Sequence, residues 1–318
     1  MSVKEIKLES EKSSLVLKAE RSCERINKSR LSFFFLAAAL LTLVFSAPLY
    51  HLLQLATRDD LYTDIPLVPM LTLYLIWLRR QRMPRSFRPA SLPGALLSLA
   101  GLLLLAVWWI ASHQASQALE NDLAANILAF LLLLTGICFV FLGKAFMRVY
   151  ACPIALLAFT IPFPTVLRHW IETLLQHGSA TFATLFFHIA GAPVTREGLN
   201  FRLSDMVIQV APECSGIHST VVLVIVSIVG GWLFLRSKWK RTTLVLAAIL
   251  LGFIRNGFRI FVIAELCMSD GPQMINSPIH RHGGPLFFAL SLIPFFFLLL
   301  YLRKTEGPNR EPSTRQSL

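Results

Sequence analysis

The sequence is poor in charged residues. Only 15% of its 318 residues are Asp, Glu, Lys or Arg, whereas 55% are hydrophobic. A soluble globular protein keeps about a quarter of its residues charged, so the composition excludes that class. The few charges cluster between long apolar runs, and a run of ~20 apolar residues is enough to cross a bilayer. The sequence therefore predicts a protein that spans a membrane several times.

The sequence also lacks paired cysteines, internal repeats and an HExxH motif. An odd number of cysteines at irregular spacing does not describe a disulfide framework, and no CxxC pair indicates a metal site. The five are Cys23, Cys138, Cys152, Cys214 and Cys267. We interpret the first three as buried or incidental thiols. We therefore expect neither a metal nor another cofactor.

The apolar runs predict an all-α polytopic integral membrane protein with about eight transmembrane helices. The spans lie at roughly 31–53, 61–78, 93–112, 123–143, 149–166, 217–235, 243–267 and 284–302. The net charge of +12 does not indicate a nucleic-acid partner, because the basic residues flank these spans as the positive-inside bias requires. The expected surroundings are membrane lipid.

The segments outside the spans are interpreted as follows. Residues 1–30 are a basic cytoplasmic tail, and the first span is a retained signal anchor rather than a cleaved signal peptide. Residues 31–303 form one transmembrane domain with a site-bearing core at 205–290, and residues 304–318 are a disordered cytoplasmic tail.

The longest stretch without a span runs from residue 167 to residue 216. Residues 170–175 have an amphipathic helical pattern, and the run at 181–190 predicts an interfacial or re-entrant helix. Residues 194–210 are predicted to be an exposed loop or a short strand.

Lysine and arginine counts predict the orientation. With the N-terminus inside, the inner segments hold 23 of the 30 basic residues and the outer segments hold five. This bias favours both termini in the cytoplasm. It places 167–216 and 268–283 together on the outer face, as expected for a multi-pass protein of the bacterial inner membrane with a site facing the periplasm.

The first segment with unusual chemistry is Ala211–Ser219, directly before the sixth span. Pro212 suits the turn into a helix and Glu213 suits its first turn. We therefore expect Cys214 near the helix N-terminus, where the local positive potential favours the nucleophilic thiolate. His218 follows four residues later and could contact Cys214 along the helix as an accessory group.

The second such segment lies inside the seventh span. Arg255 and Arg259 are four residues apart and share a helix face, with Asn256 beside them. Charges within a bilayer are costly and indicate function, so we expect a polar cavity here. Arg259 lies eight residues before Cys267, about 12 Å below the outer end of the span. The alternative is a structural pair bound to helix ends or to Glu265.

The third segment is the outer loop before the last span, which contains His280 and His282. Imidazoles titrate near neutral pH and serve as general acid or base. A thiol, a guanidinium and an imidazole on one membrane face are the groups that acyl transfer requires.

Three motifs in this order resemble those of the exosortase/archaeosortase family. They are Cys214-Ser215-Gly216 at a span entrance, Asn256-x-x-Arg259 in the next span, and His280-x-x-x-Gly284 before the last. The resemblance implies a membrane cysteine protease or transpeptidase that acts through a thioester. It implies Cys214 as nucleophile, Arg259 as the essential arginine and His280 as the histidine partner.

The resemblance also implies the substrates. These are secreted proteins that end in a sorting motif of the PEP-CTERM type, a transmembrane helix and a basic cluster. Their processing is implied to aid surface sorting and to be linked to exopolysaccharide.

Several points stay open in the sequence. Arg255 competes with Arg259, and His282 competes with His280, for the roles above. Neither the sorting motif nor the acceptor, amine or water, is named by the residues.

Three other functions are left as alternatives. One is a transporter or polysaccharide-export component that uses the intramembrane arginines. Another is a zinc site formed by Cys214, His280 and His282. The last is a redox disulfide between Cys214 and Cys267.

Overall fold

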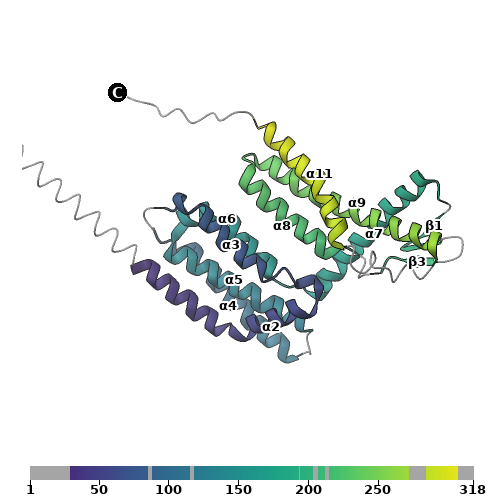
Figure 1. Ribbon diagram of the computed structural model, residues 1–318. Helices are drawn as coiled ribbons and strands as arrows, with labels where there is room; N and C mark the ends of the chain where they lie inside the picture. Colours follow the sequence, from purple (N-terminus) through teal and green to yellow (C-terminus); the bar gives the residue numbers. More distant parts are fainter. Residues whose placement is uncertain are drawn as a thin grey trace, which may run out of the picture. The chain divides into compact units, whose positions relative to one another are not determined.

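The computed structural model describes residues 29–84, 88–114, 118–192, 194–202, 207–211, 215–271 and 284–306 (Figure 1). The chain forms two compact units, divided after Thr165. The sequence analysis treated residues 31–303 as one domain, whereas contacts concentrate within each unit. Each unit is described by itself below.

The first unit consists of helices and 3-10 turns. In chain order these are Ser29–Val44, α2 (Ser46–Arg58), η1 (Asp60–Tyr62), α3 (Leu67–Leu78), η2 (Arg80–Arg82), α4 (Ser91–Gln114), α5 (Leu119–Phe141), α6 (Gly143–Leu156) and η3 (Leu157–Thr160).

The first predicted span, 31–53, is not one straight helix. Ser29–Val44 and α2 meet at Phe45 with a bend of 67°. The cause is Pro48, which has no N–H to donate to the Val44 carbonyl and whose ring crowds that carbonyl. The predicted span is therefore a bent pair of helices, which crosses the membrane once if the pair counts as one span.

Helices α4 and α5 pack closely through glycines. A Cβ on Gly94 would lie 2.6 Å from the Val140 side chain, and a Cβ on Gly136 would collide with the Ser98 hydroxyl. Small residues let two helix backbones approach, which is how helices associate in lipid without a hydrophobic driving force. The opposite face of α4 carries exposed apolar side chains such as Leu99 and Trp109.

The second unit contains four long helices and a small sheet. Its elements are α7 (Thr165–Ala190), β1 (Thr195–Glu197), β2 (Asn200–Arg202), β3 (Val207–Gln209), α8 (Ile217–Phe234), α9 (Lys238–Asp270) and α11 (Gly284–Lys304). The helical patterns expected at 170–175 and 181–190 are parts of one continuous helix, α7.

The short strand expected within 194–210 is confirmed and extended. Strands β1, β2 and β3 pair in that order as an antiparallel sheet, with Arg196 opposite Phe201 and Phe201 opposite Ile208. The all-α prediction therefore missed a sheet. Each of its strands is only three residues long, too short for a clear alternating pattern.

Within the residues that the structure describes, six helices are long and apolar enough to cross a membrane, or up to eight spans are present if each of two bent helix pairs counts as one. The protein is thus a predominantly helical, multi-span membrane protein. The predicted eight spans correspond to the upper count, in which Ser29–Arg58 and Gly143–Ala190 each cross once.

Helix α9 is longer than a membrane requires. Its 33 residues span about 50 Å, against ~30 Å for the hydrocarbon core. In Figure 1 it continues past the end of α8 to the sheet. There Ile260 and Ala264 share a core cluster with Phe187 and Phe201. Because α9 exceeds the thickness of the hydrocarbon core, it can extend beyond the membrane at one or both of its ends.

The other end of α9 is fastened to the end of α11. The Glu306 carboxylate accepts hydrogen bonds from the backbone amides of Arg236 and Ser237 at 2.9–3.0 Å. Lys240 Nζ donates to the Leu302 carbonyl at 3.1 Å. These contacts bring the basic residues of the α8–α9 turn and of the α11 terminus to one end of the helix bundle.

Glu306 lies within the segment 304–318 that was predicted to be a disordered tail. Partial burial raises its pKa, but the two backbone amides and the charges of Lys240 and Arg236 outweigh this. The net result is a pKa below the ordinary glutamate value. The ordered chain therefore continues past the last span for long enough to make this contact.

Candidate functional site

Two glycines on α9 bring three helix backbones together. A Cβ on Gly252 would lie 2.8 Å from Thr220 Oγ1 of α8, and a Cβ on Gly257 would lie 2.8 Å from the Ser179 carbonyl of α7. Any larger residue at either position would push α9 away from its neighbours. The polar pair Arg255 and Asn256 sits between these two glycines, at the junction of α7, α8 and α9.

Asn256 connects the junction to the segment before α8. Its side chain is 2% exposed. Its Nδ2 donates to Ser179 Oγ at 3.0 Å and to the Ser215 carbonyl at 3.1 Å. One amide therefore holds a residue of α7 and the chain entering α8 at the same time.

Arg255 contacts the next residue of the same segment. Its side chain is also buried, and Nη2 lies 3.3 Å from the Gly216 carbonyl and 3.5 Å from Thr220 Oγ1. A guanidinium at a helix centre costs about 2.5–3.5 kcal/mol on insertion scales, so bonds to carbonyl and hydroxyl oxygens offset part of a large penalty.

Gly216 is required by both its conformation and its neighbours. It is the N-cap of α8 with φ +71°, in the left-handed region that glycine adopts freely. A Cβ there would lie 3.0 Å from Asn256 Cγ and 3.2 Å from Arg255 Nη2. The glycine of the Cys-Ser-Gly motif thus lets the chain lie directly against the polar pair.

Val210, which lies before residues 212–214, is also hydrogen-bonded to α7. Gln176 Nε2 donates to the Val210 carbonyl at 2.9 Å, and Val210 N donates to the Leu199 carbonyl at 3.0 Å. Gln176 and Ser179 are three residues apart, so they lie on one face of α7. The same helix face therefore anchors Val210 directly and Ser215 through Asn256.

The junction retains hydrogen-bonding capacity. Among the residues that the structure describes, Arg255 Nη1 and Ser215 Oγ are buried and have no hydrogen-bond partner. A buried donor without a partner costs about 1–3 kcal/mol, so such atoms mark a place where another polar group is accommodated.

A cavity of about 280 Å³ lies beside Arg255, between α7, α9 and α11. Its other walls are mainly apolar and include Phe186, Phe258 and Phe287. The guanidinium therefore contacts Gly216 and Thr220 and also lines a small hydrophobic space within the same unit.

Comparison with protein families identifies the family of the chain. The transmembrane exosortase (EpsH) family model matches residues 54–297, which is most of the chain. The chain belongs to the transmembrane exosortase family. No curated protein and no solved structure matches it. Membership of this exosortase family is consistent with a transpeptidase role, and the matched range contains every candidate site residue.

The structure brings some of the predicted exosortase residues together. Arg255 and Asn256, predicted as accessory groups, meet at the segment that directly follows Cys214. Arg259 is half-buried and lies one turn further along the same face of α9. The alternative in which the arginines bind helix ends holds in part, since Arg255 contacts the N-terminal residues of α8.

The other predicted residues are not all described. Cys214, His280 and His282 lie outside the described residues, so their predicted roles remain predictions. Cys267 is a free cysteine and is 2% exposed. Its burial gives no support to the redox alternative.

Helix α8 begins at Ile217, as the predicted span at 217–235 does, with Gly216 in the left-handed region as its N-cap. Glu213 and Cys214 lie outside the described residues. Their expected places at the start of this helix, and the expected contact between Cys214 and His218, therefore stay predictions.

The depth expected for Arg259 depends on an outer end of the span at Cys267. Helix α9 continues to Asp270, and its Ile260 and Ala264 pack with residues of the sheet. The depth of Arg259 and Arg255 in the membrane stays a prediction.

Sequence reasoning missed the residues that complete the junction. Ser179, Thr220 and Gln176 are polar residues on helix faces that the sequence alone did not assign to a partner. Gly252 and Gly257 gave the clearer signal, because two glycines that bracket an arginine and an asparagine inside a span indicate close packing.

Proposed function

We propose that this exosortase is a cysteine protease or transpeptidase with Cys214 as its nucleophile. The observation that supports it is the anchoring of the chain next to that residue. Ser215 and Gly216, which directly follow Cys214, are bonded to Asn256 and Arg255. A nucleophile must be held in place to attack efficiently, and a fixed backbone on which it is carried supplies much of that constraint.

The proposed chemistry has two steps. The Cys214 thiolate attacks the carbonyl of the scissile peptide bond, and His280 protonates the leaving amine as the C–N bond breaks. A thioester to Cys214 and a free amine-terminated tail result. An amine or water then attacks the thioester, and the thiolate is released.

The two arginines receive different roles. Arg255 is a positioning residue, because it is bonded to the backbone that carries the nucleophile. Arg259, one turn closer to the membrane surface, is the group that stabilises the developing oxyanion or holds the substrate. One such donor typically contributes ~3–4 kcal/mol to the transition state.

The proposed substrate is a secreted protein with a PEP-CTERM-like sorting motif, a transmembrane helix and a basic cluster at its C-terminus. Its scissile bond and Arg259 would both lie near the membrane surface. The cavity beside Arg255 suits an apolar side chain close to that bond. The coupling of this processing to surface sorting and exopolysaccharide belongs to the same proposal.

The proposed orientation has the site on the outer face of the inner membrane. Arg255 follows Lys238 by 17 positions, about 26 Å along α9. The basic ends of α8, α9 and α11 meet on the Lys238 side, which the positive-inside bias assigns to the cytoplasm. The polar junction is then close to the opposite surface.

The test is co-expression with a tagged secreted protein that carries a PEP-CTERM-like tail, followed by immunoblot. Wild type is compared with Cys214→Ala and with Cys267→Ala as a matched cysteine control. The proposal expects tail removal by wild type and by Cys267→Ala, and none by Cys214→Ala. Full processing by Cys214→Ala would show that the cysteine mechanism is wrong.

A second pair of variants separates the arginine roles. Arg259→Gln is expected to lower the rate of the first step with little change in the melting temperature. Arg255→Gln is expected to lower both this rate and the melting temperature, since the hydrogen bond from Arg255 to the Gly216 carbonyl is lost. If Arg255→Gln leaves stability unchanged and removes activity, then Arg255 is the group that contacts substrate and the two roles are exchanged.

A further inference from the structure

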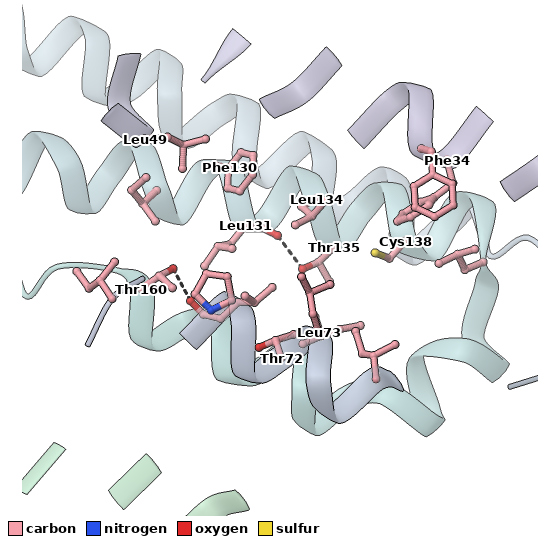
Figure 2. Close-up of a pocket in the computed structure, with 18 of the residues that line it drawn as sticks. Phe34, Leu49, Thr72, Leu73, Phe130, Leu131, Leu134, Thr135, Cys138 and Thr160 are labelled. Carbon is pink, nitrogen blue, oxygen red and sulfur yellow. Dashed lines mark hydrogen bonds between the residues drawn. The ribbon is translucent and has the colours of Figure 1, made fainter. Parts of the chain in front are cut away.

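The proposed function does not use a cavity in the first unit. It measures about 660 Å³ and is enclosed by helix Ser29–Val44 together with α2, α3, α5 and α6. Figure 2 shows side chains such as Phe34, Leu49, Phe130 and Leu134 around it. The volume is in the range of ligand pockets, ~300–1,000 Å³.

The few polar groups in its wall do not face a polar ligand. The Thr135 hydroxyl donates to the Leu131 carbonyl at 2.7 Å, as drawn in Figure 2. The Thr160 hydroxyl donates to the Leu157 carbonyl at 2.7 Å, and the Thr72 hydroxyl donates to the Pro153 carbonyl at 3.1 Å. With these donors used by the backbone, the wall offers an occupant mainly hydrocarbon contacts.

The cavity runs from an open side to a closed floor. Phe35 and Leu73, which line it, are 61% and 67% exposed. Ile127 and Leu142, also in the lining, are 1% and 2% exposed. In a multi-span membrane protein the exposed apolar side chains face lipid, so the open side connects the cavity to the bilayer.

An empty state is unfavourable for this cavity. An apolar cavity of ~150 Å³ stays dry and already binds benzene, and this one is several times larger. The free energy lost to an unfilled cavity increases with its volume. Water is not a suitable filler, because a buried water needs two to four polar partners.

We infer that this cavity binds a single hydrocarbon chain of a membrane lipid, inserted sideways between helix Ser29–Val44, α2 and α3. A protein helix does not fit. At ~10 Å width, a helix would fill 660 Å³ within about one and a half turns of ~5.4 Å each. A flexible acyl chain is narrow enough to enter through the open side and has no polar group to desolvate.

The test uses the intact protein in nanodiscs made from a single phospholipid with one palmitoyl and one oleoyl chain. After transfer to detergent, native mass spectrometry measures the phospholipid that stays bound. Leu134→Trp, on the cavity wall, is compared with Leu128→Trp, on α5 but outside the lining and 39% exposed. We expect wild type and Leu128→Trp to retain phospholipid and Leu134→Trp to lose it.

Equal retention by all three proteins would overturn the inference, because the bound lipid would then lie elsewhere on the surface. A retained peptide in place of phospholipid would also overturn it, in favour of a protein occupant. A protein that binds neither would show that the cavity is not a lipid site.

A second measurement keeps the inference testable if Leu134→Trp folds poorly. Leu134→Ala enlarges the cavity instead of filling it. A ligand that binds only the folded state raises the melting temperature. Added phospholipid is therefore expected to raise it more for Leu134→Ala, whose enlarged cavity is costlier when empty, than for wild type. An equal rise in both, or no rise in either, would contradict the inference.

Discussion

In both units, glycines bring helix backbones into close contact, but the two contacts enclose different side chains. In the first unit Gly94 and Gly136 bring α4 against α5, and the groups that meet are Val140, Ser98 and backbone. In the second unit Gly252 and Gly257 bring α9 against α8 and α7. The two contacts differ in how deeply their polar side chains are buried.

The second contact encloses buried polar side chains that bond across helices, whereas the side-chain hydrogen bond between α4 and α5, from Trp108 to Asp122, is only partly buried. Two buried side chains, Arg255 and Asn256, reach the Ser215–Gly216 segment from α9. Buried polar groups cost free energy that a purely structural contact can avoid, as the α4–α5 pair shows. This difference is what the proposed function requires, with the α7–α8–α9 junction serving the reaction and the α4–α5 contact serving stability.

The largest effect is expected from Gly216→Ala. A Cβ there meets Asn256 and Arg255, and alanine also pays for the left-handed conformation, so the segment after Cys214 must move. A displacement of about 1 Å can cost ~100-fold in rate, and we expect a loss of that order in substrate processing.

Gly198→Ala is the matched control for that change. Gly198 also has a positive φ, +64°, but a Cβ there has no neighbour within 4 Å. Gly198→Ala therefore has the free-energy cost of an alanine in the left-handed conformation but no steric clash of its Cβ. If both variants lose processing equally, backbone strain and not contact with the polar pair explains the effect.

A smaller but still large effect is expected from Asn256→Asp. The replacement keeps the shape and removes the Nδ2 donor, so the Ser215 carbonyl loses that hydrogen bond. A buried polar group left unpaired costs about 1–3 kcal/mol, which predicts a slower first step and a lower melting temperature. Asn126→Asp is the control, since that amide bonds only the Asp122 carbonyl of its own helix in the described contacts. Equal effects in both would remove the distinction between the units.

Gly136→Ala tests the first unit alone. Its Cβ would meet the Ser98 hydroxyl and the Gly94 carbonyl, so α4 and α5 must separate. Overpacking of this kind costs about 1–3 kcal/mol. We expect a lower melting temperature in detergent and unchanged processing per folded molecule. Gly230→Ala is the control, because its nearest neighbour, Leu299 Cδ2, is at 3.6 Å. A loss of activity per folded Gly136→Ala molecule would argue against a purely structural contact.

The smallest effect is expected from the hydrogen bonds between Glu306, which follows α11, and the backbone amides of Arg236 and Ser237 in the α8–α9 turn. The pKa of Glu306 is lowered in the folded state, so the carboxylate contributes stability above its unfolded pKa. This stability is lost as the pH falls through the folded pKa. We expect the melting temperature to fall more steeply in wild type than in Glu306→Gln between about pH 5 and pH 3. Parallel curves of melting temperature against pH would show that the hydrogen bonds of Glu306 contribute no measurable stability.

Most of the spans could be predicted from sequence because burial in lipid requires long apolar runs, and such runs are visible along the chain. The break at Phe45 was missed because a single proline, Pro48, determines it. The limits of α8 were predicted closely, at 217–235 against Ile217–Phe234, whereas α9 extends beyond the predicted 243–267 at both ends, where polar residues interrupt the apolar run.

The site was predictable in part for the same reason. Arg255, Arg259 and Asn256 are conspicuous inside an apolar span, so their chemistry could be read from the sequence. Ser179 and Gln176 were not conspicuous, since a serine or glutamine on an amphipathic helix usually faces water. Their role depends on which face of α7 meets α9, and that is a property of the packed structure alone.

The most direct test of the central claim is to trap the covalent intermediate. Wild-type protein is mixed with a tailed substrate, quenched, and its intact mass measured before and after treatment with hydroxylamine, which cleaves thioesters. The account predicts an added mass equal to the substrate without its tail, removed by hydroxylamine, present in Gly198→Ala, and absent in Cys214→Ala. Substrate cleavage by Cys214→Ala at the wild-type rate, with no such adduct in wild type, would contradict it.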